Sequence, residues 1–277
     1  MTLTNKMNCL TNRKWQSDPL GEYRWADCAG PMAKIADAIW IYGGSDSRLS
    51  GQLLVPHWKT CLAVIRSWTA GTYTPNDVQL SMLGPIATPR WNGEIDNVEI
   101  VAVRLQPEAV AALFDILPSD IIDRDLPVAA DPRLDEVRRI AEQGEPAERI
   151  AAALVDFLAD AANQSRTVDP LTSAAAQLLR QASGQPRISA IANHLDISEQ
   201  TFRRRFEQHV GVAPKYYARQ FRLKHVLLEM DRYPRPNWSA LALDFGYFDQ
   251  AHMIEDIRAL TGVGPSQLHA MRRQPAC

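Results

Sequence analysis

The spacing of apolar and polar positions changes along the chain from a strand pattern to a helix pattern. Over roughly the first 105 residues, short apolar or alternating runs are separated by Gly, Pro, Asn and Asp. Such runs between turn-forming residues are typical of β-strands. The sequence therefore predicts strands at 38–42, 52–55, 61–65 and 98–105.

Apolar residues recur at helical spacing after residue 105. Pro107 suits the first position of a helix that continues to Leu117, where Pro118 ends it. Further helices are expected at 133–143, 146–163 and 174–182. The second of these three has an apolar stripe, which we expect either to dock on the β-rich part or to pair with a second subunit. The stripe consists of Ile150, Leu154, Phe157 and Leu158.

The last 90 residues contain an internal repeat. The segment 206–214 (FEQHVGVAP) matches 257–265 (IRALTGVGP) at an offset of 51, and the second copy has one extra residue further upstream. A shared apolar skeleton with different polar residues indicates a duplicated structural unit.

Each copy has the local chemistry of a helix-turn-helix. Asp196 and Gly246 suit a turn that needs a positive φ, and Ser198 and Asp249 are good N-caps for the helices that follow. Inside the second helix of each copy, two apolar residues spaced four apart point into the core. The residue before each cap is expected to pack on the fourth residue of the helix, Ile197 on Phe202 and Phe248 on Met253; the core pairs are Phe202 with Phe206 and Met253 with Ile257.

Several motifs occur together and in order in this region. They are a linking helix at 214–230, a Gly-x-x-Pro after each second helix, and Asp-Gln-x-His in the second copy. The stretches ISAIANHLDISEQTFRRRFEQHVGVAPKYYARQFRL and ALALDFGYFDQAHMIEDIRALTGVGPSQL thereby resemble the AraC/XylS family of bacterial transcription regulators. The resemblance implies an α+β chain: a β-rich, cupin-like domain with helices, then an all-helical DNA-binding domain of seven helices with two helix-turn-helix units. The expected boundaries are 1–130 for a β-rich sensor domain, 131–171 for a helical connector or dimerisation segment, and 172–273 for the DNA-binding domain, with helix-turn-helix units at about 188–209 and 238–260.

The resemblance also implies which residues read DNA. On the first reading helix, Gln can pair with adenine and Arg with guanine through two hydrogen bonds each. The second helix departs from the family, because an Ile and a Glu stand where a polar residue and an Arg are usual. We expect it to bind weakly or only to position the domain. The expected base contacts are Glu199, Gln200, Arg203 and Arg204 in the first copy and Gln250, Ala251, Ile254 and Glu255 in the second; the expected phosphate contacts are Ser198, Arg205 and Lys215.

Composition and charge agree with this picture. Of the 277 residues, 46% are hydrophobic and 22% charged, which excludes a disordered chain. The net charge of −2 hides an asymmetry, because 172–277 has 14 basic and 9 acidic residues and 1–171 has 16 and 23. A basic C-terminal part is what a polyanionic partner requires, although Arg203–Arg205 alone could be a solvated face.

The first 170 residues show no motif of an enzyme or a metal site. His57 is the only histidine before residue 190, and the four cysteines form no C-x-x-C pair, so we expect no metal, cofactor or catalytic residue. No apolar run is long enough to span a membrane or to form a signal peptide, so we expect a reduced, cytoplasmic protein. By the resemblance, the N-terminal part would bind a small-molecule effector, form a homodimer, or both, and RNA polymerase would be a partner. The candidate effector pocket is lined by Trp40, His57, Trp58, Trp68 and Trp91, which could instead be core aromatics.

Two other functions stay open at this stage. The helix-turn-helix could be a protein-interaction module that no longer reads DNA, as Ile254 and Glu255 suggest. A regulator fused to an enzymatic N-terminal domain that holds zinc on cysteines is the other, although Cys9, Cys28 and Cys61 include no paired ligands.

Overall fold

The computed structural model places the chain in two compact units. It describes residues 16–17, 23–44, 47–49, 52–54, 56–69, 75, 77–128, 130–164, 169–181 and 187–273. The β-rich unit comprises Met1–Ser50, Lys59–Gly84 and Gly93–Thr167, and the helical unit comprises Gly51–Trp58, Pro85–Asn92 and Val168–Cys277.

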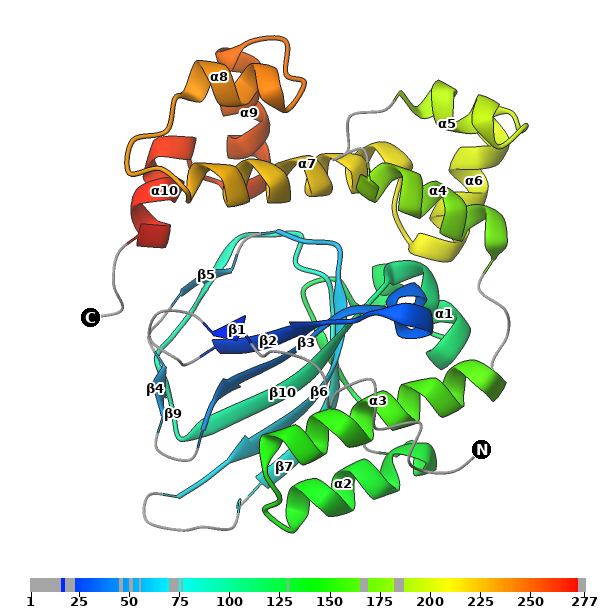
Figure 1. Ribbon diagram of the computed structural model, residues 1–277, viewed down its shortest axis with the longest axis vertical. Coiled ribbons are helices and arrows are strands. Elements are labelled where there is room, and N and C mark those ends of the chain that lie inside the picture. The colour runs from blue at the N-terminus through cyan, green and yellow to red at the C-terminus, as the bar shows by residue number, and fades with distance from the viewer. Residues whose placement is uncertain are drawn as a thin grey trace. The chain divides into compact units, whose positions relative to one another are not determined.

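An antiparallel sheet of seven strands forms the centre of the β-rich unit (Figure 1). Its central strand, β10, is rich in β-branched residues and pairs with β3 on one side and β6 on the other, so that Val101 lies opposite both Ile41 and Val64. All three of these valine and isoleucine side chains are buried. In sheet order the strands are β1 (Gln16–Ser17), β2 (Tyr23–Asp27), β3 (Ala36–Gly43), β10 (Val98–Leu105), β6 (Thr60–Ser67), β7 (Asp77–Leu83) and β11 (Asp125–Pro127).

Two short ribbons complete the strands. They pair β4 (Arg48–Leu49) with β9 (Ile95–Asp96) and β5 (Gln52–Leu54) with β8 (Arg90–Asn92). The β-rich N-terminal region that the sequence pattern predicted is thus confirmed, and the strands expected at 38–42, 61–65 and 98–105 lie inside β3, β6 and β10. The expected strand at 52–55 is β5, with Val55 outside the described residues.

The β-rich unit also contains helices. They are α1 (Pro107–Phe114), α2 (Asp135–Glu142) and α3 (Ala147–Gln164), with 3₁₀ turns at Gly30–Lys34, Pro118–Ile121 and Pro132–Leu134. The predicted end of α1 at Leu117 is wrong by three residues. Asp115 adopts the left-handed conformation, with φ of 56°, and its N–H donates to the carbonyl of Ala111, which closes the helix early.

The apolar stripe of α3 is buried within its own unit. Ile150, Leu154 and Leu158 are fully buried, and α3 packs on β10 and β3 (Figure 1). Of the two roles expected for this stripe, the structure shows the one in which it docks on the sheet.

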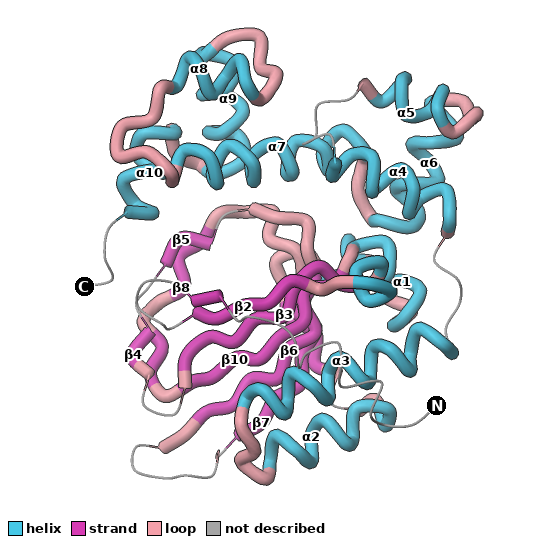
Figure 2. The backbone as a smooth tube through the Cα atoms, in the orientation of Figure 1, coloured by secondary structure: helices cyan, strands magenta, loops and turns pink. Residues whose placement is uncertain are grey.

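The helical unit contains seven helices among its described residues, and Figure 2 draws them in cyan. They are α4 (Pro170–Gln181), α5 (Ile188–His194), α6 (Glu199–Val210), α7 (Pro214–Met230), α8 (Trp238–Asp244), α9 (Gln250–Thr261) and α10 (Pro265–Arg273). Helix α4 begins four residues before the predicted Ala174, because the Asp169 carboxylate accepts a hydrogen bond from the Thr172 N–H and so caps the first turn. The predicted break at 183–186 lies outside the described residues.

Two segments distant in sequence pack with these helices. The indole N–H of Trp58 donates to the carbonyl of Val210 at 3.0 Å, and the Trp58 ring meets Tyr216 edge-on. A Cβ added to Gly262 would lie 3.8 Å from Cγ of Pro89. Trp58 therefore contacts the C-terminal end of α6, and Pro89 lies beside Gly262 at the C-terminal end of α9.

Candidate nucleic-acid interface

The first helix-turn-helix is built from α5, a tight turn and α6. Asp196 takes the expected left-handed conformation, with φ of 54°, and the Ser198 hydroxyl accepts from the Thr201 N–H at 3.1 Å. Phe202 and Phe206 are fully buried with their rings in edge contact. The turn and the N-cap predicted from the sequence are confirmed, and they leave the opposite face of α6 exposed.

The second helix-turn-helix repeats this construction in α8 and α9. Gly246 supplies the left-handed turn, and the Asp249 carboxylate accepts from the His252 N–H at 2.7 Å. Met253 and Ile257 are fully buried, as expected. Figure 1 shows the two helix-turn-helix units at opposite ends of α7.

One expected contact in the second copy is wrong. Phe248 was expected to pack on Met253, but 87% of Phe248 is exposed. The extra residue of the second turn explains the difference. Tyr247 takes the place of Ile197, since each follows the left-handed residue and donates its N–H to the equivalent alanine carbonyl, and Tyr247 is the buried one. Phe248 is the inserted residue and points outward.

The exposed face of α6 presents two cations, Arg203 and Arg204. Glu199, Gln200, Arg203 and Arg204 are all exposed. Within the described part of the chain, neither Arg203 nor Arg204 has an ion-pair or hydrogen-bond partner. Both guanidinium groups can therefore bind a ligand without first breaking a salt bridge.

Arg205, on the flank of α6, has a different environment. Its guanidinium donates to the Asp169 carboxylate at 2.6 Å. Burial would raise the pKa of Asp169, but the hydrogen bonds from Arg205 and Thr172 outweigh burial and lower the pKa to about 2. The pair ties α6 to the start of α4, so Arg205 is less available for phosphate than its sequence position suggested.

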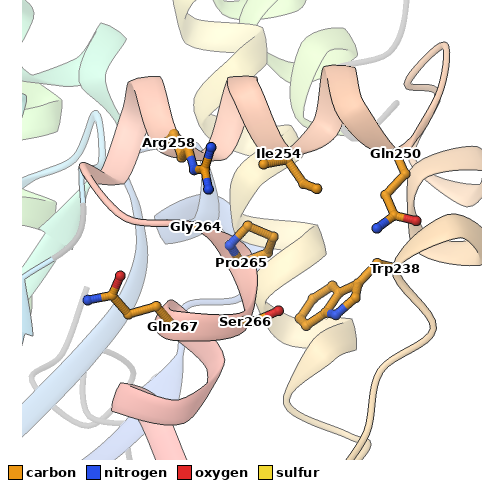
Figure 3. Close-up of a pocket in the computed structure, with 8 residues that line it drawn as sticks. All are labelled: Trp238, Gln250, Ile254, Arg258, Gly264, Pro265, Ser266 and Gln267. Carbon is orange, nitrogen blue, oxygen red and sulfur yellow. The ribbon is translucent and has the colours of Figure 1, made fainter.

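The equivalent face of α9 is more enclosed. Figure 3 shows Gln250, Ile254 and Arg258 along one side of the helix, facing Trp238 of α8 and the start of α10 across a hollow of about 250 Å³. The Gln250 amide oxygen accepts from the Ser239 hydroxyl at 2.7 Å. Ala251 and Glu255 are exposed, whereas Gln250 and Ile254 are half-buried.

A polar cluster fixes α9 on α7. Asp256 accepts from Arg219 at 2.7 Å and from the Tyr247 hydroxyl at 3.1 Å, and the Arg222 guanidinium lies over the Tyr247 ring. Burial, and then the Asp256 charge, raise the pKa of Tyr247 well above its usual range. No pattern in the sequence indicates this cluster, because its members come from α7, from the turn after α8 and from α9.

The residues expected to line an effector pocket lie in different surroundings. Trp40 packs against Tyr23, Trp68 lies under the Arg66 guanidinium, and Trp58 contacts Val210 and Tyr216. His57 pairs with Ile86 through a β-bridge, and the side chain of Trp91 lies outside the described part. The structure does not bring these five side chains into one described site.

The β-rich unit contains a partly buried ionic cluster. The Asp37 carboxylate accepts from Arg104 at 2.6 Å and lies 2.9 Å from the Lys59 ammonium. Burial would raise the pKa of Asp37, but Lys59 and Arg104 outweigh it and hold the pKa well below the usual range. Burial raises the pKa of the nearby Cys61 thiol to about 11, so this thiol is not a reactive thiolate.

The residues that the structure describes include neither a candidate metal site nor a candidate membrane span. No group of three or more His, Cys, Asp or Glu residues could hold a metal ion there. No described helix is long and apolar enough to cross a membrane.

Comparison with known proteins places the helix-turn-helix units in a family. Residues 191–271 match the family described as helix-turn-helix domain. No curated protein matches the chain significantly.

Some solved structures also align with this chain. The C-terminal domain of AraT, a response regulator from Geobacillus stearothermophilus, aligns with 40% of this chain and 92% of its own at 19% identity and a TM-score of 0.37. ToxT from Vibrio cholerae aligns with 86% of this chain and 97% of its own at 11% identity and a TM-score of 0.41. A ToxT structure with a bound unsaturated fatty acid aligns at 9% identity, covers 83% and 94% of the two chains, and has a TM-score of 0.39. With the match to the helix-turn-helix domain family and the geometry of α5–α10, residues 191–271 of this chain are an AraC-type helix-turn-helix domain, the DNA-binding domain of transcription regulators.

Proposed function

We propose that this protein is a sequence-specific, double-stranded DNA-binding transcription regulator whose β-rich unit responds to a small-molecule effector. One observation carries the proposal: on α6, Arg203 and Arg204 are exposed beside Gln200 and have no partner among the described residues. Guanidinium and amide groups on one helix face are the side chains that read guanine and adenine in the major groove.

The two reading helices, α6 and α9, make different contacts with DNA in this proposal. Helix α6 enters one major groove and α9 the next, about one helical turn away. Gln200, Arg203 and Arg204 contact bases, and Glu199 can accept from cytosine N4. In the second groove, Ala251 and Ile254 meet thymine methyl groups, Glu255 accepts from cytosine, and Gln250 donates with its amide nitrogen. Ser198 and Lys215 contact phosphates, while Arg205 mainly holds α6 on Asp169.

The β-rich unit supplies the regulation in this proposal. It binds an effector, and the regulator acts in the cytoplasm as a homodimer that contacts RNA polymerase. The boundaries near residues 130 and 172 separate sensing, connecting and DNA-binding parts. The acidic charge of 1–171 supports a partner other than nucleic acid for this part, because like charge repels the DNA backbone.

Selection of bound genomic DNA tests the function. The purified chain is mixed with fragmented genomic DNA, the bound fragments are sequenced, and the selection is repeated with candidate metabolites. We expect one enriched motif whose better-defined half belongs to α6. As a matched control, Arg235→Ala removes an exposed Arg of the helical unit away from α6 and should leave the enriched motif unchanged. A parent protein that enriches no motif contradicts the proposal.

A protein-interaction module is the second candidate function. It is favoured by the apolar Phe248, which is 87% exposed just before α9, the helix that carries Ile254 and Glu255. The same selection separates the two functions. An interaction module would bind random and genomic duplexes equally weakly, and Phe248→Ser would leave that weak binding unchanged.

A further inference from the structure

Two surface hollows of the helical unit lie at equivalent places in the repeat. The hollow of about 250 Å³ beside α9 is lined by Trp238, Gln250 and Ser266, among others. A groove of about 630 Å³ beside α6 is lined by Ile188, Glu199 and Lys215 at the equivalent positions. Helices α5 and α8 begin 50 residues apart, and the starts of the two reading helices and of the helices after them are 51 apart, which fixes these equivalences.

The two hollows differ in charge. The groove beside α6 is also lined by Arg187, Arg219 and Arg222, so four basic side chains stand against the carboxylates of Glu199 and Asp256. Asp256 is already held by Arg219. In the second copy the positions of Arg187 and Lys215 are taken by the uncharged Asn237 and Ser266, and Arg258 is the basic residue of that hollow.

The basic groove also has the position of a backbone site. It begins at Glu199, the first residue of the reading helix α6, and reaches His252, near the start of α9. Along α7 it follows Lys215, Arg219 and Arg222, which share one side of the helix at spacings of four and three. Among the described residues, Arg187 and Lys215 have no ion-pair or hydrogen-bond partner, so their charge is available to a polyanion.

We propose that this groove binds the phosphodiester backbone of the duplex beside the major groove that α6 enters. The hollow beside α9 is then the equivalent backbone site, without the two cations that correspond to Arg187 and Lys215. The inference rests on the proposed function and adds where the backbone lies. The strand that borders a major groove must pass close to the helix inserted in it, and unpaired Arg and Lys are the groups that release counterions from phosphates. Lys215 and Arg187 thus anchor the first half-site, and Ser266 leaves the second weakly held.

A reciprocal exchange of equivalent residues tests the inference. Lys215→Ser makes the first backbone site resemble the second, and Ser266→Lys makes the second resemble the first. Duplex affinity is measured over a chloride series with a mixed-sequence duplex long enough to span two successive major grooves. One phosphate contact contributes about 0.9 to the slope of log affinity against log salt, so Lys215→Ser should flatten the slope by about one and weaken binding about eightfold near 0.1 M salt. Ser266→Lys should steepen the slope by about one.

The matched control is Lys224→Ser. Lys224 is exposed on the same helix, nine residues from Lys215, which places it on the opposite side of α7. Its loss should leave the slope within error of the parent. The inference is overturned if Lys224→Ser and Lys215→Ser change the slope equally, or if Lys215→Ser and Ser266→Lys both leave it unchanged in a parent that binds DNA. A parent that binds no duplex at all overturns the proposed function as well, so the two failures are distinct.

Discussion

At the scale of single residues, three consecutive arginines on α6 differ in their contacts. Among the described residues, Arg203 and Arg204 have no partner and face solvent, whereas Arg205, one position further, is bound by Asp169. A run of three arginines in the sequence therefore contains two residues available to a ligand and one that stabilises the fold.

The first prediction concerns base readout by these two arginines. Arg203→Ala or Arg204→Ala should weaken specific binding by about 1–3 kcal/mol and relax preference at one base pair, because a bidentate contact to guanine is lost. Competition binding on selected and random duplexes measures both effects. If either variant discriminates the two duplexes as well as the parent does, that residue is not a base contact.

The second prediction concerns the acid on the second reading helix. Glu255→Arg replaces an exposed carboxylate with a cation near phosphates, so it should raise general DNA affinity and steepen the salt slope by about one unit. Specificity for the parent site should gain little. Loss of binding to the selected site alone, with random binding unchanged, would instead make Glu255 a base-reading residue.

At the scale of elements, caps and ion pairs hold the helices around the reading face. Asp169 combines two tasks, because it caps α4 through the Thr172 N–H and pairs with Arg205 of α6. Its lowered pKa means that the folded state binds this proton less readily than the unfolded state does.

The third prediction follows from that lowered pKa. The stabilisation by ionised Asp169 is present above the ordinary pKa of an Asp carboxyl, near 4, and is lost as the pH falls towards 2. Asp169→Ala should cost about 1 kcal/mol at neutral pH through the lost cap, and less as the pH falls from 4 to 2. Arg205→Ala keeps the cap and should cost less than Asp169→Ala at neutral pH. Urea unfolding at several pH values measures these differences, and equal costs for the two variants would contradict the cap.

The fourth prediction concerns the contact between Trp58 and the end of α6. Trp58→Phe removes the indole N–H and leaves the Val210 carbonyl buried without this donor, which should lower the free energy of unfolding by about 1–3 kcal/mol. Trp25→Phe is the control, since the Trp25 indole has no hydrogen-bond partner among the described residues. Equal thermal shifts for the two variants would show that the hydrogen bond contributes nothing.

At the scale of the whole molecule, the repeat and the charge asymmetry divide the chain by task. Residues 172–277, which carry the reading helices, have more basic than acidic residues. In the β-rich unit, the sheet buries the apolar stripe of α3. A subunit interface in a homodimer must therefore use a surface other than that stripe.

The fifth prediction tests this role of α3. Leu154→Ala opens a cavity in a fully buried site and should lower the free energy of unfolding by about 2–5 kcal/mol, with the sedimentation mass unchanged. Asn163→Ala, on the exposed side of the same helix, should change neither quantity. A fall in mass with stability retained would instead place Leu154 in a subunit contact.

The sequence by itself determined the local structure of the DNA-binding part. The positive φ of Asp196 and Gly246, the caps at Ser198 and Asp249, and the buried pairs Phe202–Phe206 and Met253–Ile257 depend on residues within one or two turns of each other, so their pattern could be read directly.

Only the tertiary structure decided which side chains meet across the chain. Such contacts join residues up to 152 positions apart, and a periodic sequence pattern cannot reveal them. They are the ion pair of Arg205 with Asp169, the hydrogen bond from Trp58 to Val210, and the cluster of Arg219, Tyr247 and Asp256. Phe248 is exposed because the second turn has one inserted residue. The alignment of the two repeat copies did not show which residue of the turn is the inserted one. Local sequence sets backbone conformation through short-range sterics and hydrogen bonds, whereas long-range contacts depend on how the folded elements pack.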